Sequence, residues 1–100
     1  MEYEAPSDKG YTIYSKSGCP NCTKAKKLVA SEKYNIVDCD DYIIEDKEDF
    51  LYFMSTLIGK EYRVFPMIFK DGKFIGGYAE LETFYKTEQD KKNAFSEEEF

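Results

Sequence analysis

The chain has 100 residues, which is the length of one domain, and its composition is 42% hydrophobic and 17% aromatic, enough for a packed core. This composition excludes a wholly disordered chain. Twenty acidic residues outnumber 14 lysines and arginines, and the net charge of −6 makes nucleic acid and anionic membranes unfavourable partners. Because histidine is absent, the common hydrolase triads and Cys2His2 zinc sites cannot form.

The first ten residues, MEYEAPSDKG, are acidic and polar, whereas a secretory signal is basic and then apolar. No stretch of the sequence approaches the roughly 20 apolar residues that a membrane-spanning helix needs. We therefore expect a cytoplasmic protein, and we expect it to be a monomer.

The three cysteines are too few, and odd in number, for a disulfide framework. Cys19 and Cys22 form a close pair, which indicates redox or metal chemistry. A zinc knuckle needs a second such pair or histidines, and this chain has neither. Cys39 has no partner nearby in the sequence, so we assign it no role.

Residues 11–15 alternate aromatic and β-branched types, which predicts a short strand. From Cys22 onward apolar residues recur at helical spacing while lysines occupy the other faces, which predicts an amphipathic helix over residues 20–34. Pro20 suits the first turn of this helix, because its missing N–H leaves no donor unpaired there. A second strand over residues 35–39 completes a βαβ unit.

Seven acids and one lysine lie between Asp38 and Asp49, a density that favours a solvated loop and a helix start over a core or an acidic metal site. A second helix is predicted over residues 50–58, ended by Gly59. Two strands, residues 67–69 and 73–75, form a predicted β-hairpin around an Asp-Gly turn.

A short third helix follows, marked by Leu81, Phe84 and Tyr85, and the last residues, NAFSEEEF, are predicted to fray. The element order βαβαββα predicts an α/β domain with a four-stranded mixed sheet flanked by helices, because the crossover needs a parallel strand pair and the hairpin an antiparallel one. We divide the chain into an N-terminal polar segment (1–9), this domain (10–92) and an acidic C-terminal tail (93–100).

The position of Cys19 predicts an activated thiol. A helix N-terminus offers unpaired N–H groups and a partial positive charge, and Lys16 adds a full charge nearby. Cysteines in such settings have pKa values of roughly 3.5 to 7.5, so Cys19 is the predicted nucleophile. Cys22 lies one helical turn inward on the apolar face, where a buried thiol suits the resolving step of thiol–disulfide exchange.

The chain resembles a dithiol glutaredoxin in the order and spacing of four features. They are a strand, the motif Lys16-x-x-Cys19-Pro20-x-Cys22 at a helix start, Val64-Phe65-Pro66 before a strand, and Gly76-Gly77 before a helix. The resemblance implies a thioredoxin-like fold and a glutathione-dependent thiol–disulfide oxidoreductase. Its implied partners are glutathione and disulfide-containing or glutathionylated proteins, with ribonucleotide reductase as one candidate.

The resemblance also implies a glutathione site. Lys16 would face the glycine carboxylate of glutathione, with Arg63 as a second candidate. Pro66 would follow a cis peptide bond, and the backbone of Phe65 would pair with the cysteine of the tripeptide. The γ-glutamyl carboxylate would meet N–H groups at the last helix start, which follows the Gly76-Gly77 turn; the residues concerned are Gly77, Tyr78 and Ala79.

Several positions depart from the family pattern. Asn21 replaces a common aromatic residue and Phe65 a common valine, and Ala79 and Glu80 stand where Ser or Thr and Asp are common. Two alternatives therefore stay open: a thioredoxin-like reductase that does not use glutathione, and an iron–sulfur carrier in which Cys19 of two chains and two glutathiones supply the ligands. The missing Trp disfavours the first, and Pro20, which stiffens the helix start, disfavours the second.

Overall fold

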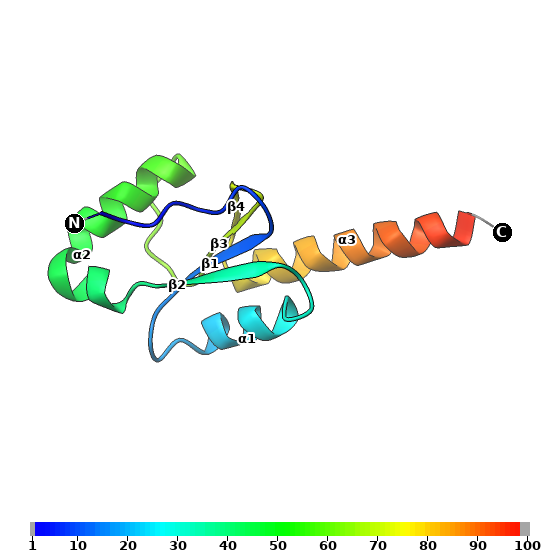
Figure 1. Cartoon of the computed structure of the whole chain (residues 1–100), viewed down its shortest axis with the longest axis horizontal. Helices are drawn as coiled ribbons and strands as arrows, with labels where there is room; N and C mark the ends of the chain where they lie inside the picture. Colours follow the sequence, from blue (N-terminus) through cyan, green and yellow to red (C-terminus); the bar gives the residue numbers. More distant parts are fainter. Residues whose placement is uncertain (1, 99–100) are drawn as a thin grey trace.

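The structure, a computed structural model, describes residues 2–98, with side chains up to residue 91. Its centre is a four-stranded sheet of order β2-β1-β3-β4 (Figure 1). The strands are β1 (Tyr11–Ser15), β2 (Tyr34–Asp38), β3 (Met67–Lys70) and β4 (Lys73–Gly76). β1 pairs in parallel with β2 and antiparallel with β3, which confirms the predicted mixed sheet.

Helices cover both faces of the sheet, and the alternation of side chains along β1 explains why. Tyr11 and Ile13 pack with residues of α1 (Pro20–Leu28) and α3 (Tyr78–Glu98) on one face. Tyr14 packs with residues of α2 (Asp40–Ile58) on the other. All five residues of β1 are buried, as expected for a central strand between two helical layers.

Helix α1 is shorter than the predicted helix over residues 20–34, because it ends at Leu28. The amide of Glu32 donates to the carbonyl of Val29 in a turn that redirects the chain toward the sheet. Pairing with Tyr11 then starts β2 at Tyr34, one residue earlier than predicted. The amide of Tyr11 donates to the carbonyl of Lys33 at 2.9 Å, so the segment after this turn pairs with β1 instead of continuing the helix.

Helix α2 begins ten residues earlier than predicted, at Asp40, and contains a break at Asp46, whose φ of −160° and ψ of 86° are not helical. The carboxylate of Asp46 accepts a hydrogen bond from the amide of Asp49, 3.1 Å away, and so starts the second half of the helix. The acidic stretch is therefore helical and exposed rather than a loop. No metal-binding cluster of acidic or cysteine side chains occurs in the described part of the chain.

The predicted hairpin is confirmed. Asp71 and Gly72 both have positive φ, 52° and 83°, as a two-residue turn between twisted strands requires. The turn is tied to the start of β1, because the amide of Gly10 donates to Asp71 Oδ1 at 2.7 Å.

The prediction of a short third helix was wrong, since α3 extends from Tyr78 to Glu98 and its C-terminal half projects away from the sheet (Figure 1). Leu81 is buried against the sheet and Phe84 packs beside it. Tyr85 packs against the same cluster. Residues 86–91 are polar and mostly good helix formers, which favours continuation of the helix. The predicted fraying of residues 93–98 was therefore also wrong, and residues 99–100 lie outside the described part.

The N-terminal polar segment packs on α2. The ring of Tyr3 contacts Phe50 and Tyr42 with centroids 5.4 and 5.0 Å away. The hydroxyl of Tyr14 donates to the carbonyl of Glu4 at 2.6 Å. Within the described residues, none of the helices has the length and hydropathy to cross a membrane.

Candidate active site

The cysteine pair lies at the start of α1, where the chain leaves the C-terminal end of β1. Cys19 is the N-cap residue, with extended backbone angles of −117° and 97°, and Pro20 is the first helical residue. The Sγ atom of Cys19 accepts a hydrogen bond from the amide of Cys22 at 3.2 Å. A sulfur that carries negative charge would be stabilised at this position, because a helix N-terminus favours anions.

Cys19 and Cys22 form a disulfide, with their Cα atoms 5.2 Å apart. The two sulfurs differ in access: Cys22 is 1% exposed within the α1 core, whereas Cys19 is half-buried at the surface. An incoming thiolate or disulfide therefore meets Cys19 first. Cys22 can reach a sulfur that is already attached to Cys19, which is the geometry that thiol–disulfide exchange requires.

The structure brings Lys16 and Phe65, two of the predicted site residues, into contact. The ammonium of Lys16 lies 5.6 Å from the ring centroid of Phe65, within the range of a cation–π contact. The Phe65–Pro66 peptide bond is cis, as predicted, and Pro66 is buried. Phe65 also stacks on Phe50 of α2, so its ring is held between the core and the lysine.

The start of α3 supplies a second group of predicted site residues. Gly77 is buried and caps the helix, and its amide donates to Glu80 Oε1 at 2.8 Å. Tyr78 and Ala79 follow in the first turn, where backbone N–H groups have no partner within a helix. Tyr78 is linked to α1, because the ammonium of Lys24 lies 5.9 Å from its ring centroid.

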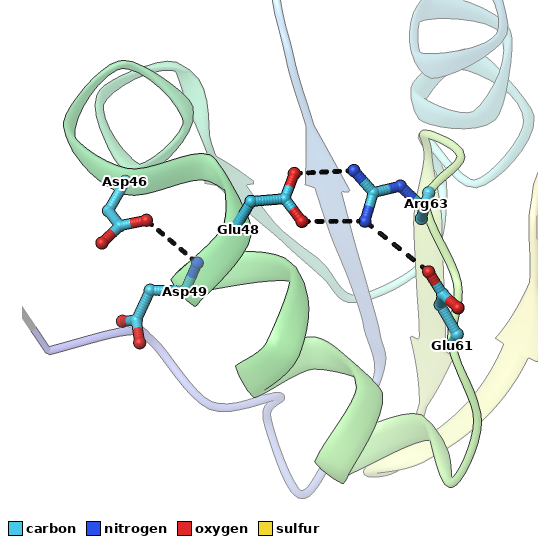
Figure 2. A network of polar contacts seen from close by, with 5 residues as sticks. All are labelled: Asp46, Glu48, Asp49, Glu61 and Arg63. Carbon is cyan, nitrogen blue, oxygen red and sulfur yellow. Dashed lines mark hydrogen bonds and ion pairs between the residues drawn. The ribbon is translucent and has the colours of Figure 1, made fainter.

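The side chain of Arg63 is paired with two glutamates (Figure 2). Its guanidinium forms two hydrogen bonds with the carboxylate of Glu48, at 2.8 and 3.1 Å, and lies 3.6 Å from Glu61. These carboxylates raise the pKa of Arg63, and the guanidinium lowers that of Glu48. The structure therefore does not group Arg63 with Lys16, because Arg63 is paired with Glu48 of α2 and with Glu61 of its own segment.

Comparison with known proteins places this site in a family. Residues 11–75 match the glutaredoxin family model. The sequence is 34% identical over 80 residues to a glutaredoxin of Haemophilus influenzae, covering 74% of this chain and 87% of that protein. The chain belongs to the glutaredoxin family. Glutaredoxins are glutathione-dependent thiol–disulfide oxidoreductases, and this chain has the dithiol form of their cysteine pair.

Solved structures share the fold of this glutaredoxin. Glutaredoxin 1 of Francisella tularensis superposes with a TM-score of 0.68 at 27% identity, over 81% of this chain and 96% of that one. A buckwheat glutaredoxin solved with glutathione superposes with a TM-score of 0.66 at 23% identity, over 81% and 72% of the two chains. Both superpositions confirm the thioredoxin-like architecture expected from the sequence.

The third cysteine of this glutaredoxin lies inside the protein. Cys39 is 0% exposed, and its thiol donates to the carbonyl of Val37 at 3.5 Å. Burial raises the pKa of this thiol to about 12. It is therefore a neutral core residue at physiological pH, in keeping with the absence of any role assigned from the sequence.

Sequence reasoning missed Asp40, which supports the loop before Cys19. Its carboxylate accepts hydrogen bonds from the amide and hydroxyl of Ser17, and the amide contact is 2.9 Å long. A signal for it exists in the sequence: β1 and β2 are parallel, so the residues that follow each strand lie at the same edge of the sheet. Asp40 and Ser17 each stand two residues past the end of their strand.

Proposed function

We propose that this glutaredoxin reduces mixed disulfides of glutathione and disulfides of proteins, with Cys19 as nucleophile and Cys22 as resolving thiol. The observation that carries the proposal is the asymmetry of the pair: Cys19 caps a helix N-terminus at the surface, while Cys22 is buried one turn inward. The disulfide between them is the oxidised product of such a reaction.

A protein disulfide is reduced in two thiol–disulfide exchange steps. The Cys19 thiolate attacks one substrate sulfur, forms a mixed disulfide and releases the other substrate sulfur as a thiolate, which takes a proton from solvent. Cys22 loses its proton and attacks Cys19 Sγ, which closes the disulfide and releases the second substrate sulfur. The substrate gains two electrons and two protons. Two glutathione molecules then reopen the pair and leave as glutathione disulfide.

Two regions support glutathione binding. Lys16 offers its charge to the glycine carboxylate beside Phe65 and Pro66, and a charge-assisted contact there orients the tripeptide near Cys19. The N–H groups of Tyr78 and Ala79 are available to the γ-glutamyl carboxylate at the start of α3. The amide of Gly77 is already paired, because it donates to Glu80. The buckwheat glutaredoxin solved with glutathione shares the fold of this chain.

Single serine variants of the two cysteines test these roles. Cys19→Ser should abolish both deglutathionylation and reduction of a protein disulfide, since no other thiol has the activated position. Cys22→Ser should keep deglutathionylation, because a second glutathione resolves the Cys19 adduct, and should lose reduction of an internal disulfide. Cys39→Ser is the matched control and should keep both activities.

Mass spectrometry of Cys22→Ser after exposure to glutathione disulfide should detect one glutathione attached to Cys19. Equal loss of both activities in Cys22→Ser, without that adduct, would contradict the proposed use of glutathione. Full activity of Cys19→Ser would contradict its assignment as the nucleophile.

A further inference from the structure

The charge of this acidic protein is unevenly distributed along the chain. Residues 9–31, which contain both redox cysteines, hold five of the 14 cationic side chains and none of the 20 acidic ones. The rest of the chain therefore carries nine cations against 20 anions. The polypeptide around the redox pair is positive, although the protein as a whole is strongly negative.

Four of these lysines, Lys16, Lys24, Lys26 and Lys27, lie around the start and the outer face of α1 and are named here the lysine patch. Lys24 and Lys27 are exposed on the face opposite the buried residues of α1, in a stripe that begins at Pro20, next to Cys19. Lys16 and Lys26 border a hollow of about 150 Å³ between α1 and the ends of β1 and β2. The remaining residues that line this hollow are Ser15, Ser17, Ile36 and Asp38.

Acidic neighbours do not neutralise the lysine patch. Among the described residues, none of its four lysines forms an ion pair, whereas Lys70 and Arg63 do. Asp38 lines the hollow with Lys16 and Lys26, and the charge of Lys16 acts on the carboxylate of Asp40, so the charge of these two lysines is partly compensated. Lys24 and Lys27 are exposed and form no ion pair within the described residues, so their charge is the part of the patch most available to a partner.

We propose that the lysine patch is the docking surface for polypeptide substrates that carry acidic residues next to their disulfide. The inference rests on the proposed function, because disulfide exchange brings a polypeptide against Cys19. Complementary charge beside a reacting sulfur raises the rate of encounter and orients the substrate. Longer polyanions fit less well, because the rest of the chain has an excess of 11 negative charges and repels phosphates that extend beyond the patch.

The test is a single-turnover reduction by the prereduced protein, which needs no glutathione. Three short peptides, each closed by one disulfide, differ in flanking residues: glutamate, glutamine or lysine. The rate constant for each peptide is divided by its rate constant with dithiothreitol, which removes differences in intrinsic reactivity. At about 10 mM salt we expect glutamate to exceed lysine by about tenfold, with glutamine between, and at about 1 M salt we expect the three to converge.

Two double variants distinguish an effect of the lysine patch from an effect of net charge. Lys24→Gln with Lys27→Gln should lower the rate constant of the glutamate peptide by about threefold and leave that of the glutamine peptide unchanged. Lys33→Gln with Lys73→Gln removes the same charge near the start of β1, at the opposite end of the sheet, and should leave the preference intact. Both pairs change exposed side chains.

Three outcomes would overturn the proposal. Equal rates for the three peptides at low salt would show no electrostatic recognition, and equal losses in both double variants would show an effect of net charge alone. Tight binding of a single-stranded oligonucleotide or of anionic phospholipid vesicles, lost on changing Lys24 and Lys27, would make the patch a site for another class of partner. Failure to reduce even the glutamine peptide would instead contradict the proposed function itself.

Discussion

The amide of Ser17 donates to Asp40 Oδ1 at 2.9 Å, and the hydroxyl of Ser17 donates to the second carboxylate oxygen. These contacts join the loop before Cys19 to the first turn of α2. The amide of Cys39 donates to the carbonyl of Ser15 at 2.8 Å and reinforces the same junction. The position of the nucleophile relative to the sheet therefore depends on a carboxylate 21 residues further along the chain.

Asp40→Asn should weaken this junction at neutral pH. The hydrogen bonds from Ser17 lower the pKa of Asp40. A carboxylate whose pKa is lowered on folding stabilises the protein above its unfolded pKa of about 3.9, and this contribution is lost as the pH falls through the folded value. The melting temperature of Asp40→Asn should therefore be lower than wild type near pH 7 and should converge with it near pH 3.

Asp41→Asn is the matched control, because Asp41 is exposed and makes no side-chain hydrogen bond within the described residues. It should melt as wild type across the pH range. Equal melting curves for wild type and Asp40→Asn near pH 7 would show that the Ser17 contacts contribute nothing to stability.

Alkylation of the reduced protein should distinguish the nucleophile from the core cysteine. The rate at Cys19 should rise with pH around a midpoint well below 8.5, because the helix start and Lys16 favour the thiolate. Cys39 should stay unmodified between about pH 5 and 9, because burial raises its pKa to about 12 and blocks access. Peptide mapping measures both rates; a midpoint near 8.5 at Cys19 would contradict its activation.

Lys16→Gln should affect both the pKa of the Cys19 thiol and the binding of a glutathionylated substrate. Removal of its charge should raise the pH midpoint of Cys19 alkylation. The KM for a glutathionylated peptide should rise by about threefold to fivefold, the loss expected for one partly exposed charge contact. Lys33→Gln, an exposed lysine at the far end of the sheet, serves as the control. If both quantities match those of the control, Lys16 is a solvated side chain beside the motif.

Arg63→Gln should change the KM for the same glutathionylated peptide by less than twofold. Its guanidinium already binds Glu48 through two hydrogen bonds, so it is not a free cation for a glutathione carboxylate. The kinetic comparison with Lys16→Gln measures this difference directly. A rise in KM as large as that of Lys16→Gln would show that Arg63 leaves Glu48 when glutathione binds.

The sequence alone determined the order of elements and the chemistry of the pair. Local signals were sufficient because each depends on neighbours in the chain: alternation in residues 11–15, Pro20 at a helix start, and Asp71-Gly72 in a tight turn. Because Cys19 and Cys22 are three residues apart and Pro20 favours a first helical turn, the sequence predicts both at one helix start. The cis bond before Pro66 followed from the family resemblance.

Tertiary structure decided the features that depend on distant partners. Strand pairing with Tyr11 ended the turn after α1. The packing of α2 brought Glu48 to Arg63 and the carboxylate of Asp40 to Ser17. The contacts of Ser17 with Asp40 and of Arg63 with Glu48 join residues 23 and 15 positions apart, so no local periodicity records them. The lysines of α1 are visible in the sequence, but the folded structure shows that their charge faces solvent beside Cys19, because the apolar face of α1 must pack on the sheet.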